Sequence, residues 1–282
     1  MKLYPENYNT DRHVQPGEEM GCCDALEVPC AAGTLIGFVL TPNHTPGEKH
    51  PAVIMLHGFP GHTSNHDLGQ ALRRVGFVVL NPYAPGAWGS GGNYTFDGLI
   101  DAACAVAQWL RSDEIAEKYH VDTENIFLFG HSMGGFTAVN VMRRLPWIRG
   151  GVLAAPYDYP WFFENGRELL EFSDLLPEGH CLHTASPTAL FENARAVYRE
   201  LAFSRAEDLK GRDLYFIGGK RDDLAPPATM IEPLYQRLCA DPAASAAVRY
   251  DLLDSDHSFN DRRMELCQKV CQWMAEKAIV KF

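Results

Sequence analysis

The sequence predicts an α/β protein with a mostly parallel sheet covered by helices on both faces. Short apolar runs, typical of buried strands, alternate with longer segments in which apolar residues recur at helical spacing. Several of the short runs end abruptly in glycine, histidine or aspartate, and the carboxyl ends of parallel strands are where ligands gather. Large α/β sheets reach this length undivided, so we expect one domain over residues 1–282.

The first half of the chain is expected to open with a hairpin and to continue with alternating strands and helices. Its first 20 residues are polar and irregular, and CAAG separates the two hairpin strands. A glycine-rich stretch, APGAWGSGGNYT, is expected to form a loop. The predicted elements are strands at 22–30, 34–41 and 52–56, a helix at about 65–75, a strand in GFVVLNPY, a helix in FDGLIDAACAVAQWLRS, a strand at 126–129 and a helix at about 133–144.

The second half continues the alternation around one interruption. The predicted elements are a strand in GGVLAAPYD, a strand and loop in DLYFIGGKRDD, a helix at about 227–239, a strand and loop in VRYDLLDSDHSFND and a helix at about 260–278. The stretch from about 160 to 211 is rich in aromatic and acidic residues and lies between two sheet strands. We expect it to be a cap inserted into the domain. Its aromatic residues either line a substrate pocket or form the core of the cap, and the sequence favours neither.

Composition excludes several classes of protein. The net charge is 25 − 36 = −11, which argues against a general binder of nucleic-acid backbone. Because no run approaches 18 consecutive apolar residues, we expect no membrane span, and because the first ten residues lack a hydrophobic signal core, we expect a cytoplasmic protein. The eight cysteines are then expected to be reduced. No zinc spacing or P-loop is present, so neither a metal nor a cofactor is expected.

One serine stands between glycines where a predicted strand gives way to a helix. Residues 130–134, GHSMG, fit the G-x-S-x-G pattern of a nucleophile elbow in the strand–turn–helix setting that this pattern requires. A tight turn alone would also explain the glycines. The setting favours Ser132 as a nucleophile, with the helix amino terminus behind it stabilising developing negative charge.

A serine nucleophile needs a base and a group that orients the base. His257 follows the last predicted strand, as the chain order serine, acid, histidine requires. The acid is expected in GGKRDDLAPP, where Asp222 lies three residues after Gly219 and is favoured over its neighbour Asp223. Both are loop carboxylates, and only geometry can decide between them.

Acyl transfer also needs N–H donors for the oxyanion. The backbone of Met133, directly after Ser132, should supply one donor. Phe59 in HGFPG, after an early strand, should supply the other. The alternative is that HGFPG is only a turn.

These motifs resemble those of the α/β-hydrolase family, in the family's order and over nearly the whole chain from about residue 22. They are MLHGFPG, GHSMGG, GGKRDDLAPP and DSDHSFND. The resemblance implies an eight-stranded, mostly parallel sheet and hydrolysis through an acyl-enzyme. GAWGSGGNYTFDGLIDA is similar, more loosely, to a segment of bacterial cinnamoyl or feruloyl esterases and of serine aminopeptidase-type hydrolases.

The favoured function is a serine carboxylesterase for small or aromatic acyl esters. A serine peptidase acting on short peptides is an alternative, since the same triad serves both, and Glu164, Glu168 or Glu171 in the cap would then bind the peptide amine. A non-catalytic ligand receptor on the same scaffold is the third interpretation. The expected partner is a small-molecule ester, with no nucleic acid and no membrane. The oligomeric state is open, with a homodimer as one option.

Overall fold

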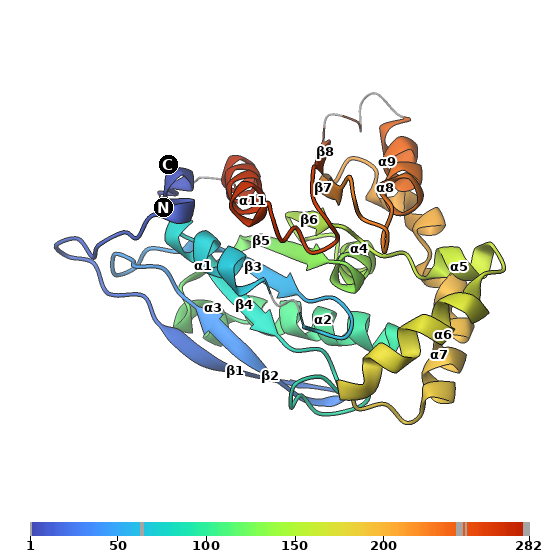
Figure 1. Cartoon of the computed structure of the whole chain (residues 1–282). Helices are drawn as coiled ribbons and strands as arrows, with labels where there is room; N and C mark the ends of the chain where they lie inside the picture. Colours follow the sequence, from blue (N-terminus) through green and yellow to red (C-terminus); the bar gives the residue numbers. More distant parts are fainter. Residues whose placement is uncertain (1, 63–64, 241–244, 246, 279–282) are drawn as a thin grey trace.

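A computed structural model describes residues 2–62, 65–240, 245 and 247–278 (Figure 1). Its centre is an eight-stranded sheet in the order β1-β2-β4-β3-β5-β6-β7-β8. The pairs β1–β2 and β2–β4 are antiparallel, and every later pair is parallel. The strands are β1 (Cys23–Cys30), β2 (Gly33–Leu40), β3 (His50–Leu56), β4 (Val78–Pro82), β5 (Val121–His131), β6 (Gly150–Ala154), β7 (Asp213–Gly219) and β8 (Val248–Leu253). The predicted fold class is confirmed.

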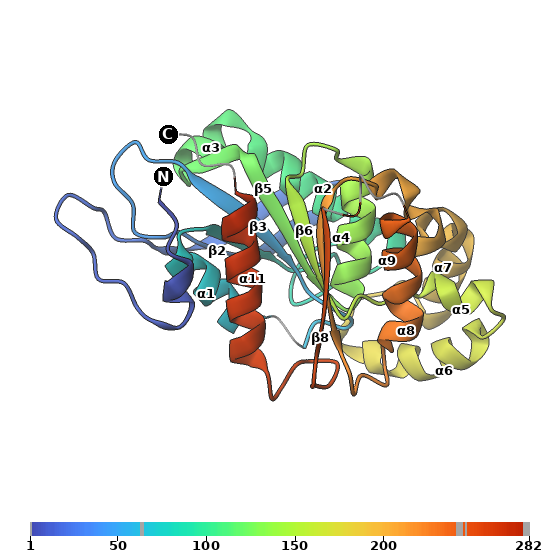
Figure 2. The ribbon, with the colours of Figure 1, turned by 90° about the horizontal axis from the view of Figure 1, so that it is seen from above.

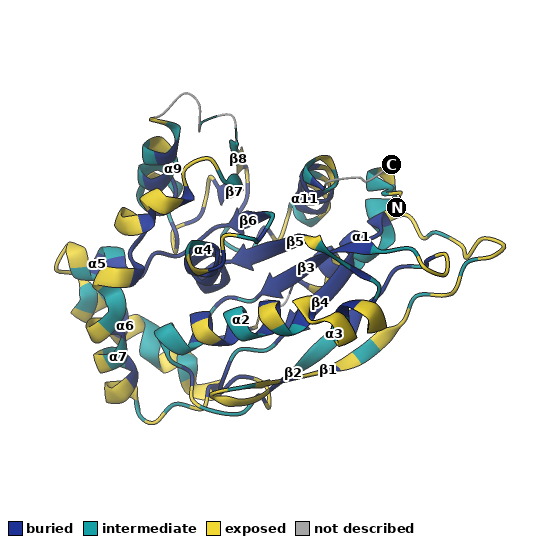
Figure 3. Ribbon diagram, turned by 180° about the vertical axis from the view of Figure 1, so that it is seen from behind, coloured by how far each residue is buried: buried dark blue, intermediate teal, exposed yellow. Residues whose placement is uncertain are grey.

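The central strands are apolar on both faces because helices cover both sides of the sheet. Successive side chains of a strand point to opposite faces. In β5, Phe127 and Phe129 accordingly belong to one buried cluster, and Ile126 and Leu128 to the other. Figure 3 shows these strands as buried, with exposed residues on the outer sides of the helices.

One face is covered by α1 and α11, the other by α2, α4 and α9 (Figures 1 and 2). The 3-10 helix η1 packs against α1 and α11. The helices outside the cap are α1 (His66–Val75), α2 (Phe96–Arg111), α3 (Asp113–Lys118), α4 (Met133–Arg144), α8 (Pro227–Met230), α9 (Glu232–Cys239) and α11 (Arg263–Lys277), with η1 at Pro5–Asn9. No helix in these described ranges is long and apolar enough to cross a membrane.

The segment between β6 and β7 forms a group of helices at one end of the molecule (Figure 2). They are α5 (Pro160–Glu164), α6 (Glu168–Glu178), η2 (Gly179–Cys181), α7 (Pro187–Leu201) and η3 (Phe203–Leu209). We call residues 160–211 the cap. Phe163 stacks on Tyr198 with ring centres 4.8 Å apart, and Phe172 meets Phe163 and Phe191 edge-on. Most of the cap aromatics therefore pack on one another.

Two local departures from the sequence prediction have simple causes. The helix expected at 227–239 is split into α8 and α9 at Ile231, because Pro233 has no N–H and its ring clashes with the carbonyl four residues earlier. The short helices η1 and α3 were not predicted. Each has at most six residues, too few to show an apolar period.

Candidate active site

The sharp turn between β5 and α4 places Ser132 at the carboxyl edge of the sheet. Ser132 has φ 56° and ψ −122°, a sparsely populated conformation for a residue with a side chain. Its N–H donates to the Ala154 carbonyl at 3.0 Å, and its own carbonyl accepts from Gly135, Phe136 and Tyr157 at 2.8, 3.2 and 3.0 Å. These four hydrogen bonds stabilise a backbone conformation whose strain alone costs about 1–3 kcal/mol.

The glycines around Ser132 are required by close approach of other backbone. A Cβ on Gly130 would lie 2.2 Å from the Gly134 carbonyl oxygen, and one on Gly134 would lie 1.9 Å from that of Leu56. The loop after β3 also packs against the turn, since a Cβ on Gly58 would lie 3.0 Å from the Cβ of Ser132. The turn between β5 and α4 can therefore press against β3 only when these positions lack side chains.

His257 and Asp222 meet in the next pair of loops along the sheet edge. His257 Nδ1 lies 2.8 Å from Asp222 Oδ2, and the carboxylate is fully buried. The other oxygen, Oδ1, accepts from the backbone N–H groups of Leu224 at 3.0 Å and Ala225 at 2.7 Å. Its neighbour Asp223 is exposed. Of the two carboxylates that the sequence offers, Asp222 is the one that contacts His257.

His131 joins the two halves of the site, a role that sequence reasoning missed. Its Nε2 lies 2.8 Å from the backbone carbonyl of His257, and the two imidazoles are 5.0 Å apart between ring centres. Burial, and then the neighbouring His257, lower the pKa of His131 to about 3. A neutral His131 must carry its proton on Nε2 to donate to that carbonyl. The residue before the nucleophile therefore positions the loop that carries His257. Its place inside GHSMG was the available signal.

The loop after β3 carries Phe59, and the preceding Gly58 packs against the turn at Ser132. His57 fixes this loop: its Nε2 accepts from the N–H of Ala84 at 3.0 Å, so its Nδ1 carries the proton and donates to the Gly58 carbonyl at 2.8 Å. Burial lowers the pKa of His57. Among the described residues, neither the N–H of Phe59 nor that of Met133 donates a hydrogen bond. Both expected oxyanion donors are thus unpaired.

The turn that carries Ser132 and the loops that carry Phe59, Asp222 and His257 lie at one edge of the sheet. No hydrogen bond joins Ser132 Oγ to His257 in the described part of the chain. Such bonds are often long before a substrate binds. His131, which directly precedes Ser132, still holds the backbone of His257 close to the Ser132 turn.

Asp158, four residues after the end of β6 at Ala154, contacts the cap and not His257. Its side chain is buried, and both of its oxygens lie 3.3 Å from the N–H of Phe203, at the far end of the cap. Burial raises the pKa of Asp158 to about 8. The neighbouring Tyr157 is buried too, and its ring stacks on Phe162 with ring centres 5.7 Å apart. Asp158 therefore closes the base of the cap.

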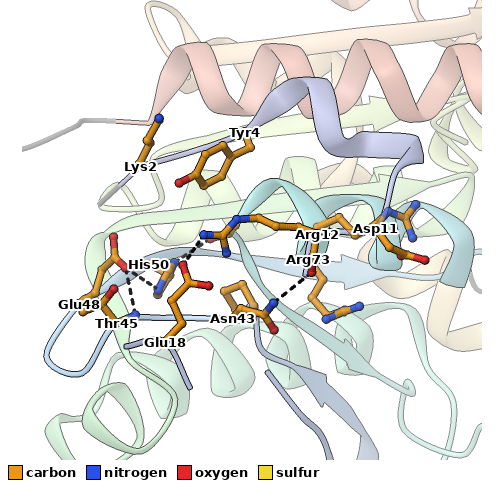
Figure 4. A pocket seen from close by; sticks show the side chains of 13 residues that line it. Lys2, Tyr4, Asp11, Arg12, Glu18, Asn43, Thr45, Glu48, His50 and Arg73 are labelled. Carbon is orange, nitrogen blue, oxygen red and sulfur yellow. Dashed lines mark hydrogen bonds and ion pairs between the residues drawn. The ribbon is translucent and has the colours of Figure 1, made fainter. Parts of the chain in front are cut away.

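A polar pocket of about 250 Å³ lies at the opposite edge of the sheet (Figure 4). It is lined by His50, which begins β3, and by Gly76, which precedes β4, whereas Ser132 follows the far end of β5. Two of its charged side chains, Arg12 and Glu18, form an ion pair with each other. This pocket is therefore separate from the residues described above.

Several solved structures share this fold at low sequence identity. Est1E from Butyrivibrio proteoclasticus has a TM-score of 0.65 at 17% identity, covering 90% of this chain and 98% of that one. An esterase from Pyrococcus furiosus has a TM-score of 0.65 at 18% identity, covering 98% and 94%. The acylaminoacyl peptidase of Pyrococcus horikoshii has a TM-score of 0.64 at 16% identity, covering 94% of this chain and 43% of that one. These likenesses show a shared fold.

At the level of sequence, a comparison with curated proteins finds no match. Residues 53–269 match the family described as "Alpha/beta hydrolase family", from Val53 in β3 to Lys269 in α11. The matched region includes GHSMGG, GGKRDDLAPP and DSDHSFND, so the resemblance predicted from those motifs is confirmed. Since the match extends over well more than half of the 282 residues, the chain belongs to the α/β-hydrolase family.

Proposed function

We propose that this protein is a serine carboxylesterase that hydrolyses small or aromatic acyl esters through an acyl-enzyme. The main support is one arrangement at the carboxyl edge of the sheet: Ser132 on its strained turn, linked through His131 to a His257 that is bonded to buried Asp222 at 2.8 Å. One of the structures with this fold, from Pyrococcus furiosus, is described as an esterase, which fits the proposal.

In the first step, Ser132 Oγ attacks the ester carbonyl carbon and its proton passes to His257. Asp222 accepts a hydrogen bond from the Nδ1–H group of His257, which leaves the lone pair on Nε2 to take the serine proton. The Asp222 carboxylate also stabilises the imidazolium that forms. His257 then donates the proton to the alkoxide that leaves, and the acyl group stays on Ser132.

The second step repeats the first with water. His257 takes a proton from water, the hydroxide attacks the acyl carbonyl, and the proton returns to Ser132 Oγ as the carboxylic acid leaves. In both steps a negative charge develops on the carbonyl oxygen. The free N–H groups of Phe59 and Met133 would hold this charge, and a single such donor is worth about 10²–10³ in kcat.

The direct test is the hydrolysis of p-nitrophenyl acetate, butyrate and octanoate, and of methyl ferulate, by wild type and Ser132→Ala. The variant should lose at least about 10⁴ in kcat/KM with an unchanged circular dichroism spectrum. Ser112→Ala, at the exposed start of α3, is the matched control and should keep full activity. Ester hydrolysis that persists in Ser132→Ala would overturn the assignment.

A serine peptidase is the second candidate, because acidic residues of the cap face a cavity beside Asp223 and Leu224. An aminoacyl-p-nitroanilide separates the two. Faster hydrolysis of the anilide than of every ester in the panel would establish a peptidase. Ester binding without turnover would instead indicate a non-catalytic receptor.

A further inference from the structure

The strand β8 ends the sheet and pairs on one side only. Within the ranges that the structure describes, β8 pairs with β7, and no strand pairs with its other edge. Figures 1 and 2 show β8 with α9 on one side and α11 on the other. The edge strand at the other end, β1, carries Asp24, Glu27 and Pro29, and charges of one sign and proline discourage pairing with another chain. The sequence of β8, VRYDLL, has neither device.

The backbone groups that β8 leaves free belong to alternate residues. The carbonyls of Ala247 and Leu253 accept N–H groups in β7 and directly after it, at 3.0 and 2.8 Å. The N–H and C=O of one strand residue point to the same side, and the next residue points both groups the other way. Odd-numbered residues of β8 therefore face β7. The outward-facing residues are Val248, Tyr250 and Leu252.

The side chains along this edge differ between the two faces of the sheet. On the α11 face, Asp251 lies 2.9 Å from Lys269 of α11 and 3.1 Å from Arg249. On the α9 face, the ring of Tyr250 packs against α9. Leu252 lies on the same face as Tyr250 and is 39% exposed, although it is apolar. One face of the edge thus carries a charge of each sign, and the other is apolar.

These charges select one register for pairing β8 with a second copy of itself. In an antiparallel pair, residues directly opposite each other lie on the same face, so the two-fold axis must pass beside a residue and not between two. An axis at residue 249 or 251 would place Arg249 opposite Arg249, or Asp251 opposite Asp251, and like charges there are destabilising. An axis at Tyr250 places Arg249 of each copy opposite Asp251 of the other.

The register about Tyr250 also pairs the outward backbone groups and the apolar side chains. Tyr250 would face Tyr250, and Val248 would face Leu252, and each of these pairs would exchange both N–H···O bonds. The exposed side chain of Leu252 would then lie beside Val248 of the other copy. Charge, hydrogen bonding and apolar contact therefore agree on a single register.

We propose that two copies of this chain associate through β8, antiparallel about a two-fold axis at Tyr250, so that their sheets form one continuous sheet. The self-complementary charges fit a second copy of the chain. Because paired β8 strands run in opposite directions, the two proposed active sites would lie on opposite edges of the joined sheet, and each copy should act alone. The association goes beyond the esterase function and does not depend on it.

Sedimentation velocity of the whole chain tests the association. Wild type should sediment as a dimer at micromolar concentration and dissociate on dilution. Arg249→Glu places an acid opposite Asp251 and should raise the dimer dissociation constant at least tenfold, whereas Arg249→Lys should keep the dimer. Arg195→Glu, at an exposed arginine of α7, is the matched control and should leave association unchanged. A monomeric wild type, or a dimer insensitive to Arg249→Glu, would overturn the proposal.

Two further variants separate loss of the interface from loss of the fold. Leu252→Pro removes an outward N–H that β7 does not use, and proline is tolerated at such positions of edge strands. Its melting temperature should stay close to that of wild type while the dimer is lost, and a Leu252→Pro variant that dimerises like wild type would also overturn the proposal.

Mixing two variants restores the facing charges. Asp251→Lys alone should be monomeric, but mixed with Arg249→Glu it should form a heterodimer, because the two chains then carry opposite charges at both facing positions. Association in the mixture would show that the facing charges, and not a folding defect, account for the loss in Arg249→Glu. The sedimentation results stand whether or not any ester is hydrolysed.

Discussion

Two buried aspartates follow neighbouring strands of the sheet and have different surroundings. Asp222, after β7, receives three hydrogen bonds at 2.7 to 3.0 Å, from His257 and from two backbone N–H groups. Among the residues that the structure describes, Asp158, after β6, has one donor, the N–H of Phe203, at 3.3 Å from each oxygen. Both side chains are buried. Burial at Asp158 therefore goes largely unopposed and raises its pKa to about 8.

The difference shows that depth in the protein does not decide what a carboxyl group does. The loop after β7 turns two N–H groups onto Asp222, which fixes the carboxylate and leaves one oxygen for His257. The loop after β6 leads directly into α5 and offers no such turn, so Asp158 is protonated near neutral pH and joins two ends of the cap. Donor geometry separates a proposed catalytic group from a structural one.

The largest effect is expected from Asp222→Asn. The side-chain amide lacks the negative charge that stabilises the imidazolium, and its NH2 group can donate to Nδ1, which favours the wrong tautomer of His257. We expect kcat/KM for p-nitrophenyl butyrate to fall by about 10⁴. Asp223→Asn, one residue later and exposed, is the matched control and should stay within a few-fold of wild type. Similar losses in both variants would refute the choice of Asp222.

The second test concerns the stability that depends on Asp158. Its folded pKa of about 8 is raised above the unfolded value, so its stabilising contribution is complete below about pH 4 and is lost as pH rises toward 8. Asp158→Asn removes this dependence. Between pH 5 and 8, the unfolding free energy of the variant relative to wild type should rise by up to about 4 kcal/mol. Urea unfolding at the two pH values measures this, and parallel curves would contradict a protonated Asp158.

A third test asks whether the His131 link holds His257 beside Asp222. In His131→Gln the side-chain amide can still donate to the His257 carbonyl, but from a less favourable position. We expect kcat to fall about tenfold while KM changes little. Because the pKa of His131 is lowered to about 3, wild type loses stability as pH falls below about 6.5, and the variant should lose less. Unfolding between pH 7 and 4 provides this second measurement. Unchanged kcat together with an unchanged acid profile would exclude the positioning role.

The smallest effect is expected from Arg237→Met. Arg237 donates to the Phe203 carbonyl at 2.8 Å, and its charge partly opposes the rise in the pKa of Asp158. Removing the charge should raise that pKa by a fraction of a unit. Carbon NMR of the Asp158 carboxyl measures the shift directly. A lower pKa in the variant would mean that Arg237 acts on Asp158 with the opposite sign.

The fold could be predicted from sequence because its signals are local. The strand–turn–helix around Ser132 is visible in spacing alone, and the alternation of strands and helices follows from apolar periodicity. The choice between Asp222 and Asp223 was not available in this way, since adjacent residues differ only in which direction the loop turns them. The structural role of Asp158 could not be predicted from sequence either. Its partner Phe203 lies 45 residues later, and such pairs leave no periodic trace.

The cap aromatics divide in a way that composition could not show. Phe163, Phe172, Phe191 and Tyr198 pack together, as one of the two open interpretations proposed. Trp161 and Phe162 instead line a cavity between the cap and the loop that follows β7. That a substrate occupies this cavity stays a prediction. The set divides because α5 contacts the rest of the cap on one side and this cavity on the other.

The hydrogen-bonded contact between Asp158 and Phe203 also has a consequence for exchange of the cap. β6 ends at Ala154 and β7 begins at Asp213, and the contact between Asp158 and Phe203 brings the two connecting segments together. We therefore expect β6 and β7 to keep their register when the residues between Asp158 and Phe203 change. Insertions, exchanges or deletions there would alter the cap without shifting a strand. A different cap could therefore be grafted between these two positions. Divergence in substrate could use the same route.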